Sequence, residues 1–322
     1  MLCDRFGRRI NYLRVSVTDR CNLRCLYCSQ RDRFSWLPPE EILSYEELFE
    51  VIQTAVTLGF TRLRLTGGEP LLRKGLISFI ARLSNLSGLK DLTMTTNGTL
   101  LSEQAQELKK AGLRRINISL DTLDPQKFEK ITGRPYLSKV LEGIEAALRV
   151  GFSPVKINVV VMRGINDDEL LDLAGLAKDL PLEVRFIEFM PVGEGTFWNE
   201  ERLLDQDEMK RRLAPLGRLS PVDSTGAGPA TTYVFPGAKG KIGFIGAMTH
   251  HFCQKCNRLR LTPEGRLRPC LFSDEEVDLK GLLRRPHTLE EVKETIKKAV
   301  FLKPATRLGR KFPRRLMRSI GG

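Results

Sequence analysis

The sequence predicts an α/β fold in which helices wrap a parallel sheet, and three observations support this. Over about the first 215 residues, short runs rich in β-branched residues alternate with longer stretches of helical periodicity. The helical stretches are long enough to carry the chain back across a parallel sheet. Along each predicted strand, apolar and polar residues alternate, which indicates that the two faces of the sheet have different surroundings.

Six strand–helix units follow one another in this part of the chain. Strands are expected at 13–18, 62–66, 91–95, 115–120, 155–162 and 183–190, and helices at 44–58, 75–85, 101–111, 137–150, 167–180 and 206–214. Because a closed barrel of this kind needs eight units, six units predict a partial (β/α)6 TIM-type barrel that stays open.

The pattern changes beyond residue 215. The segment 221–240 is rich in Gly, Pro, Ser and Thr, which predicts loops and turns. Short strand-like pieces near 241–245 and 258–262 precede an acidic helical stretch and a basic tail. We therefore expect two domains, a barrel over 1–215 and a second region over 216–322.

The polar face of the predicted strands carries several cations. If the apolar face packs against the helices, the polar face lines the lumen and brings Arg14, Arg64, Lys156 and Arg185 into it. Buried cations without partners are costly, so an anionic ligand is expected in the lumen. An antiparallel sheet with one solvated face would show the same alternation and is the alternative.

The charge balance also favours an anionic partner. The chain of 322 residues has 52 basic and 39 acidic residues, a net charge of +13. Seven of the basic residues lie in the last 22, where a solvated tail is the simplest interpretation. No apolar run reaches the length of a membrane helix, and the first residues do not resemble a secretion signal. We therefore expect no membrane association and a cytoplasmic location.

Six of the seven cysteines form two groups of three. Cys21, Cys25 and Cys28 (the first triad) directly follow the first predicted strand, where barrel enzymes place their chemistry. A closed zinc site needs four ligands. A [4Fe–4S] cluster held by three thiolates keeps one iron open to a ligand. A zinc site completed by Cys3 or by a distant residue is the alternative.

Cys253, Cys256 and Cys270 form the second triad. Zinc completed by His250 or His251 remains open as an alternative to a second cluster, whereas His287 is expected at the surface. A basic zinc module that binds nucleic acid would look similar. The region lacks the interleaved aromatic residues that stack on bases, so we expect no nucleic-acid partner.

The first triad, with Tyr27 before its last cysteine, resembles that of the radical S-adenosylmethionine (SAM) enzymes. Further segments at successive strand ends fit this resemblance: Gly67-Gly68-Glu69-Pro70, Thr95-Thr96-Asn97-Gly98 and Ser119-Leu120-Asp121. The resemblance implies that the first triad holds a [4Fe–4S] cluster whose open iron chelates SAM. It also implies that Tyr27, Gly68, Ser119 and Met190 surround SAM.

With both triads and the Arg-Pro-Cys270-Leu-Phe segment, the chain resembles the GTP 3′,8-cyclase family of molybdenum cofactor biosynthesis. Ser29-Gln30 departs from the Met-Pro that this family commonly has. The resemblance implies a second [4Fe–4S] cluster on Cys253, Cys256 and Cys270 that holds the guanine of GTP. The implied contacts to GTP are Arg14, Arg64, Thr95, Lys156, Arg258 and Arg260, with Arg185 added from the lumen argument.

The implied reaction is the conversion of GTP to (8S)-3′,8-cyclo-7,8-dihydroguanosine 5′-triphosphate. The implied partners are a flavodoxin- or ferredoxin-type electron donor, the downstream cyclic pyranopterin monophosphate synthase and a second copy of the chain. The resemblance also implies that the terminal Gly321-Gly322 reaches the active site, although the residues alone favour a frayed end. The rival functions are a peptide-modifying radical SAM enzyme with a relay cluster and a zinc protein that binds nucleic acid.

Overall fold

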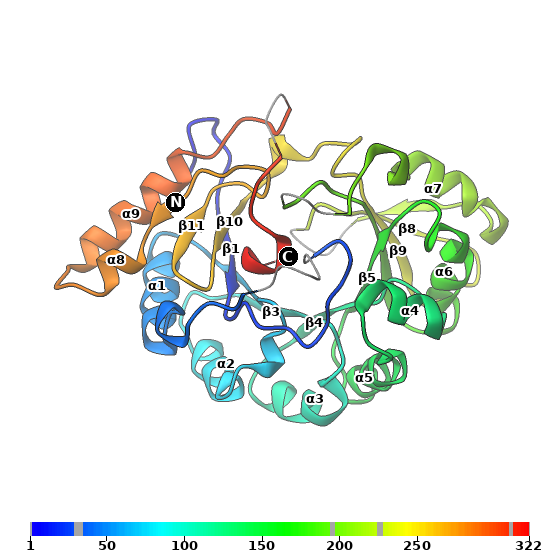
Figure 1. Cartoon of the computed structure of the whole chain (residues 1–322), viewed down its shortest axis with the longest axis horizontal. Coiled ribbons are helices and arrows are strands. Elements are labelled where there is room, and N and C mark those ends of the chain that lie inside the picture. Colours follow the sequence, from blue (N-terminus) through cyan, green and yellow to red (C-terminus); the bar gives the residue numbers. More distant parts are fainter. Residues whose placement is uncertain (1, 29–34, 194–196, 224–227, 309–311, 322) are drawn as a thin grey trace.

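A computed structural model describes residues 2–28, 35–193, 197–223, 228–308 and 312–321. Its centre is a sheet of six parallel strands, each followed by at least one helix, arranged as an incomplete ring (Figure 1). The strands are β1 (Tyr12–Ser16), β2 (Arg62–Thr66), β3 (Asp91–Thr96), β4 (Arg115–Ser119), β5 (Val155–Val161) and β6 (Leu182–Glu188). All five neighbouring pairs run parallel, which confirms the partial barrel and rules out the antiparallel alternative.

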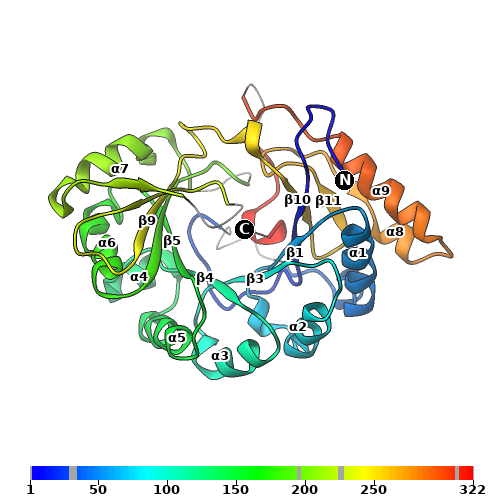
Figure 2. The ribbon, with the colours of Figure 1, turned by 180° about the vertical axis from the view of Figure 1, so that it is seen from behind.

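Helices cover the outer face of this sheet (Figure 2). They are α1 (Tyr45–Thr57), α2 (Leu76–Ser84), α3 (Leu101–Lys110), α4 (Pro125–Thr132), α5 (Leu137–Arg149), α6 (Leu170–Asp179) and α7 (Gln206–Arg212). The outward side chains of the strands, such as Leu13, Leu63 and Ile157, are fully buried against these helices. Only α4 was not predicted, because it is short; Asp124 caps it and Pro125 occupies its first turn.

Strands from the C-terminal region extend both edges of the barrel sheet. β9 (Lys241–Ile245) pairs in parallel with β6, and β10 (Arg258–Leu261) pairs in parallel with β1. Beyond them the sheet continues in antiparallel fashion, in the order β12-β11-β10-β1-β2-β3-β4-β5-β6-β9-β8-β7. The outermost strands are β7 (Ser220–Val222), β8 (Thr231–Val234), β11 (Arg266–Arg268) and β12 (Val277–Asp278). The expectation of loops alone over 221–240 was therefore wrong, because β7 and β8 pair there across a turn-rich sequence.

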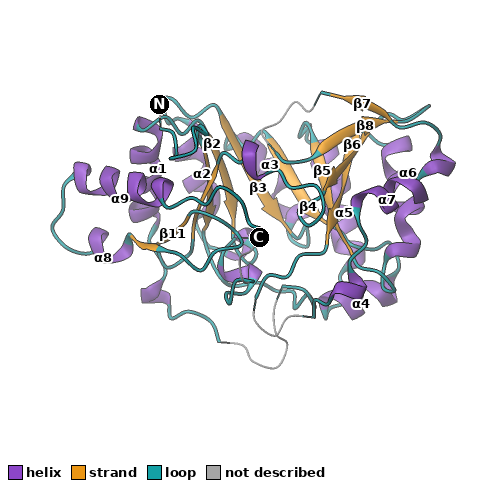
Figure 3. Ribbon diagram, turned by 90° about the horizontal axis from the view of Figure 1, so that it is seen from above, coloured by secondary structure: helices purple, strands orange, loops and turns teal. Residues whose placement is uncertain are grey.

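The last part of the chain closes around the lumen. α8 (Lys280–Leu283) and α9 (Leu289–Phe301) pack outside the sheet beside α1, and Thr288 and Glu291 form a capping box on α9. After α9 the chain turns inward, and its described end lies in the middle of the ring (Figure 1), between the two sides of the sheet when seen from above (Figure 3). No helix in the described ranges is both long and apolar enough to cross a membrane.

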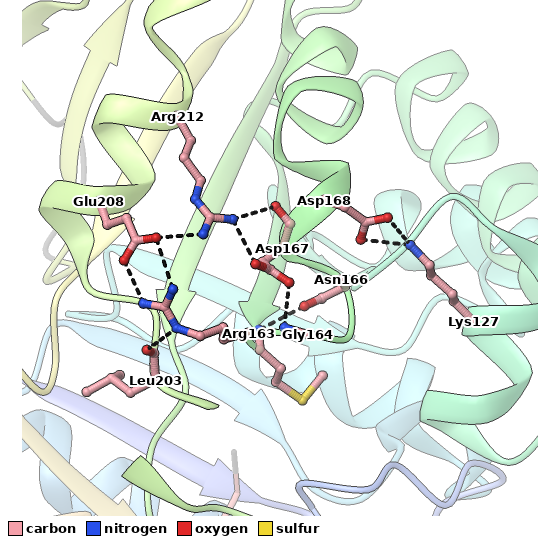
Figure 4. A network of polar contacts seen from close by, with 10 residues as sticks. Lys127, Arg163, Gly164, Asn166, Asp167, Asp168, Leu203, Glu208 and Arg212 are labelled. Carbon is pink, nitrogen blue, oxygen red and sulfur yellow. Dashed lines mark hydrogen bonds and ion pairs between the residues drawn. The ribbon is translucent and has the colours of Figure 1, made fainter. Parts of the chain in front are cut away.

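A polar network fixes the loop after β5 to α7 (Figure 4). Asp167 accepts a hydrogen bond from the backbone N–H of Gly164 at 2.6 Å and pairs with Arg212 at 2.7 Å. Arg163 pairs with Glu208 at 2.6 Å. These ion pairs are partly exposed, so each contributes at most about 1 kcal/mol, and their main effect is to orient the segment after the last barrel strand.

Candidate functional site

The lumen of the barrel contains a cavity of about 300 Å³ that both cysteine triads line. Most of the predicted contact residues also line it: Tyr27, Gly68, Ser119, Met190, Arg14, Arg64, Thr95, Arg185, Arg258 and Arg260. Lys156, in contrast, does not line it. The polar strand face therefore points into the cavity, as the alternation of the strands predicted.

The first triad lies on the loop that leaves β1. The backbone N–H of Arg24 donates to the carbonyl of Thr132 at 2.7 Å, and that of Leu26 donates to Ile131 at 2.9 Å. Both acceptors belong to the unpredicted helix α4, so this helix supports the cysteine loop. Three thiols that face one cavity suit a [4Fe–4S] cluster with one open iron, because soft thiolates are preferred ligands of iron–sulfur clusters.

Gly67 and Gly68 bring the end of β2 against the start of the cysteine loop. The N–H of Gly68 donates to the carbonyl of Thr18, and the N–H of Glu69 donates to that of Arg20, each at 2.7 Å. A Cβ on Gly68 would overlap the carbonyl oxygen of Arg20. Glycine is required here by the close approach of two backbones, and not only by a turn.

Glu69 connects this segment to the end of β3. Its carboxylate accepts hydrogen bonds from Thr96 Oγ1 at 2.7 Å and from the backbone N–H of Asn97 at 2.6 Å. Complete burial raises the pKa of Glu69 to about 7. Asn97 Nδ2 in turn lies 3.7 Å from Cys21 Sγ and donates to it, so three strand ends converge on one thiol.

Asp121, at the end of β4, is a second buried carboxylate that accepts hydrogen bonds near the first triad. Tyr27 donates its hydroxyl proton to Asp121 Oδ2 at 2.6 Å, and the backbone N–H of Val160 donates to Oδ1 at 2.8 Å. Burial raises the pKa of Asp121 to about 6 despite these hydrogen bonds. Tyr27 is thus held by its ring hydroxyl while its backbone lies between Cys25 and Cys28.

The thiols of the first triad lie in surroundings that disfavour their ionisation. Burial and the charge of Glu69 raise the pKa of Cys21 to about 11. Burial and the neighbouring Cys21 raise the pKa of Cys28 to about 12, and the pKa of Cys25 is also raised by burial. Binding of a cluster must therefore displace protons from these thiols.

The second triad differs at Cys256, which lies beside cations. It lies on the turn Cys253–Lys255, on Cys256 just before β10, and on Cys270 after β11. Although burial raises the pKa of Cys256, the charges of Arg258 and Lys303 outweigh it and lower the pKa to about 6. A thiolate is therefore favoured here before any metal arrives.

The described end of the chain lies against the cations of the lumen. Arg260 Nη1 donates to the carbonyl of Gly321 at 2.6 Å, and Arg14 Nη2 lies 3.4 Å from the same oxygen. Gly321 has φ +72°, and a Cβ on it would overlap Thr66 Oγ1. The expectation of a frayed end is therefore wrong for Gly321, because buried guanidinium groups bind its carbonyl. Gly322 and Ser29-Gln30 lie outside the described residues.

Two of the four cations on the polar strand face form ion pairs with a carboxylate of the protein. Lys156 Nζ lies 2.5 Å from Glu183 Oε2, and Arg185 pairs with the other carboxylate oxygen of Glu183 at 2.5 Å. The argument that these buried cations require an external anion is therefore wrong for Lys156 and Arg185. Glu183 lies directly opposite Lys156 in the β5–β6 register, so the pairing follows once the two strands are aligned.

The histidines and Cys3 lie in separate settings. His250 pairs with Asp207 at 2.9 Å, and His287 bonds Glu50 at 2.7 Å. His251 lines the cavity, where its Nδ1 lies 3.2 Å from the Nε of Arg307. Cys3 is exposed and does not line the cavity. No group of three Cys, His, Asp or Glu side chains in the described ranges is arranged to hold a single metal ion.

Sequence analysis missed several polar residues that support this site. The motifs around Glu69, Asn97 and Asp121 did not predict their roles: Asp121 accepts from Tyr27, Asn97 donates to Cys21, and Glu69 accepts from Thr96. Lys303 was counted only as part of a basic tail, yet it is 2% exposed and lines the cavity. Nothing in the local pattern around Lys303 distinguishes it from the other cations of the tail, of which Arg314 is exposed.

Comparisons with known proteins agree with this geometry. Residues 15–177 match the radical SAM superfamily, and residues 182–308 match the Molybdenum Cofactor Synthesis C family. A GTP 3′,8-cyclase of Thermodesulfovibrio yellowstonii is 51% identical over 99% of both chains. One of Petrotoga mobilis is 46% identical over the full length of both.

Solved structures show the same fold at low identity. SuiB of Streptococcus suis, bound to its precursor peptide SuiA, matches 95% of this chain and 68% of its own with a TM-score of 0.64 and 15% identity. The match to methylornithine synthase covers 65% of this chain and 63% of that one, with a TM-score of 0.50 and 20% identity. These two matches show the fold alone. Near-full-length identity to the cyclases shows more: the chain belongs to the GTP 3′,8-cyclase family of radical SAM proteins.

Proposed function

We propose that the chain converts GTP to (8S)-3′,8-cyclo-7,8-dihydroguanosine 5′-triphosphate, the first step of molybdenum cofactor biosynthesis. One observation carries the proposal: both cysteine triads line a single cavity, together with Arg14, Arg64 and Arg260. A triphosphate carries about four negative charges and is bound well by arginine forks. The cavity thus joins a site for radical generation to a site for an anionic nucleotide.

The cofactors of this family are SAM and [4Fe–4S] clusters. When bound and reduced, the first cluster supplies the electron that cleaves SAM to a 5′-deoxyadenosyl radical. We assign this cluster to Cys21, Cys25 and Cys28, the second cluster to Cys253, Cys256 and Cys270, and the SAM contacts to Tyr27, Gly68, Ser119 and Met190. Met190 packs with Phe272 and Ile320 from the C-terminal region, so both parts of the chain enclose the SAM side.

The remaining polar residues would bind and orient GTP. We assign Arg14, Arg64, Thr95, Arg258 and Arg260 to this role, and Arg185 and Lys156 to the triphosphate. Lys156 pairs with Glu183 and does not line the cavity, so its side chain must move to make such a contact. Arg14 and Arg260 hold the carbonyl of Gly321, so the tail and the nucleotide share the same donors. Enclosure of both reactants excludes water from a radical reaction.

The domain division and the partners follow from the same proposal. The barrel, 1–215, would bind SAM and contribute most of the GTP contacts. The region 216–322 would hold the second cluster and contribute Arg258 and Arg260. A one-electron donor of flavodoxin or ferredoxin type, transfer of the product to a cyclic pyranopterin monophosphate synthase, and a homodimer are supported by the family resemblance. The six free thiols of the triads support a reducing, cytoplasmic location.

The test is an anaerobic assay of the reconstituted protein with SAM and a chemical reductant. The yield of 5′-deoxyadenosine is compared with GTP, with ATP and without nucleotide, and products are separated from GTP by chromatography before their masses are measured. A strong increase with GTP alone, and a cyclised GTP isomer, would support the proposal. Slow formation that is indifferent to nucleotide would favour a peptide-modifying enzyme. Bound zinc without 5′-deoxyadenosine would favour a nucleic-acid-binding protein.

A further inference from the structure

Lys303 is a buried ammonium group at the second triad, and it belongs to neither proposed binding set. It follows α9 directly and is 2% exposed. Its Nζ donates to the carbonyl of Arg258 at 2.8 Å and to the carbonyl of Pro269 at 2.8 Å. Arg258 is two residues beyond Cys256, and Pro269 immediately precedes Cys270. One side chain therefore joins the two segments that carry these cysteines.

The charge of Lys303 has no carboxylate counterpart within the described ranges. Its partners there are the two carbonyls, and no ion pair joins it to Asp or Glu. A buried charge is costly unless an anion offsets it. Burial lowers the pKa of Lys303, and the thiolates of Cys256 and Cys270 are the nearby anions that oppose this shift.

Lys303 differs in this respect from the two arginines of β10. Arg260 reaches across the lumen to the carbonyl of Gly321, and Arg258 lies beside Cys256, where a substrate would also be bound. Lys303 has two of its three N–H groups fixed by the backbone of the cysteine segments. Its position is therefore set relative to the ligands of the cluster, whatever occupies the rest of the cavity.

We propose that Lys303 is a positioning residue and the counter-charge of the second iron–sulfur cluster. It holds the Cys256 and Cys270 segments at a fixed separation, and its positive charge favours the reduced, more negative form of the cluster. Nearby charge and hydrogen bonding set the potential of such clusters. The inference rests on the proposed function, because that function places a cluster on the second triad.

The experiment uses the full chain with the first triad removed, so that only the second cluster is measured. The parent carries the substitutions C21S, C25S and C28S. Into it we introduce Lys303→Gln, which keeps hydrogen-bond donors but loses the charge, and Lys303→Met, which loses both. Lys298→Met, at an exposed position of the helix α9 that precedes Lys303, also removes one lysine charge and is the control. Iron and sulfide content and a redox titration followed by electron paramagnetic resonance are the readouts.

Lys303→Gln is expected to keep four irons and to make reduction about tenfold less favourable, which is about 59 mV for a one-electron couple. Lys303→Met is expected to show the same shift and to lose part of its iron, because no hydrogen bonds from residue 303 then join the Cys256 and Cys270 segments. Lys298→Met should match the parent. Loss of iron in both Lys303 variants, with the circular dichroism of the fold unchanged, would also support the proposal.

Two results would overturn the proposal. One is a full cluster in both Lys303 variants with a reduction equilibrium within twofold of the parent. The other is loss of the folded circular dichroism spectrum in both variants, which would assign Lys303 to the fold alone. Failure of the proposed function is recognised separately, because the parent with Lys303 intact would then bind no four-iron cluster at the second triad.

Discussion

The two cysteine triads line the same cavity, yet their surroundings differ in charge and in origin. The first triad lies on a single loop after β1, and hydrogen bonds from the ends of β2, β3 and β4 support it. The carboxyl groups of Glu69 and Asp121 are its buried neighbours. The second triad is assembled from two segments on either side of β10 and β11. Its charged neighbours are the half-buried Arg258 and the buried Lys303.

This difference suits the two triads to different ligands. At the first triad, burial and neighbouring negative charge oppose thiolate formation, so only a strongly bound metal cluster keeps the thiols ionised. At the second triad, the cations stabilise a thiolate and also attract an anion. A neutral or zwitterionic ligand therefore fits the first site, and a highly charged nucleotide fits the second.

The largest expected effect separates the roles of the triads by activity. Cys21→Ala should abolish formation of 5′-deoxyadenosine, because the first cluster is lost. Cys253→Ala should retain SAM cleavage and lose conversion of GTP. Cys3→Ala, at an exposed position outside the cavity, is the control and should retain both. The measurement is the yield of both products per enzyme. Complete loss of SAM cleavage in both triad variants, with folding intact, would contradict the division.

The next largest effect is expected in the reactivity of the thiols in metal-free protein, which depends on the charges around each triad. At pH 7 the thiol of Cys256, with its pKa near 6, should be alkylated by iodoacetamide about 100-fold faster than that of Cys21, after allowance for the lower nucleophilicity of a more acidic thiol. Below pH 6 the rate at Cys256 should fall, since its thiolate becomes protonated. Mass spectrometry of peptides gives both rates. Equal rates at pH 7 would show that the two triads share one electrostatic environment.

A smaller effect concerns nucleotide binding at the second triad. Arg260→Gln removes a buried charged donor, and charged hydrogen bonds contribute about 1.5–3 kcal/mol each, so the Kd for GTP should rise at least about tenfold. The Kd for SAM should be unchanged. Arg266→Gln on the neighbouring strand β11 removes the same charge from an exposed side chain and is the control. Equilibrium binding gives the Kd of each ligand. An equal loss of SAM affinity would show that Arg260 serves both binding sites.

The smallest effect concerns the ligand environment of the first triad. Asn97→Ala removes the donor to Cys21 Sγ, a long bond of 3.7 Å worth about 0.5 kcal/mol. Reduction of the first cluster should become about twofold less favourable, and the second cluster should not respond. A redox titration of both clusters in one sample provides the comparison. A larger response at the second cluster would show that the two are coupled.

Much of the fold follows from local pattern. The six parallel strands and the helices around them were predictable. The periodicity of helices and the alternation of apolar and polar residues in strands are visible within a few residues, as in Leu13-Arg14-Val15. Helix α4 was missed because its eight residues carry few apolar positions. The strands β7 and β8 were missed because they are only three and four residues long and lie in a sequence rich in turn-forming residues.

The site, like the fold, was predictable in part from the local sequence. The spacing of the cysteines and the motif segments at the strand ends determined the chemistry, since ligands such as Cys21, Cys25 and Cys28 lie close together in the chain. The tertiary structure alone decided which charges meet. It paired Lys156 with Glu183, brought the carbonyl of Gly321 to Arg260, and buried Lys303 between the segments of the second triad. The physical reason is that cysteine spacing and alternation act over a few residues, whereas the neutralisation of a buried charge depends on partners from anywhere in the chain.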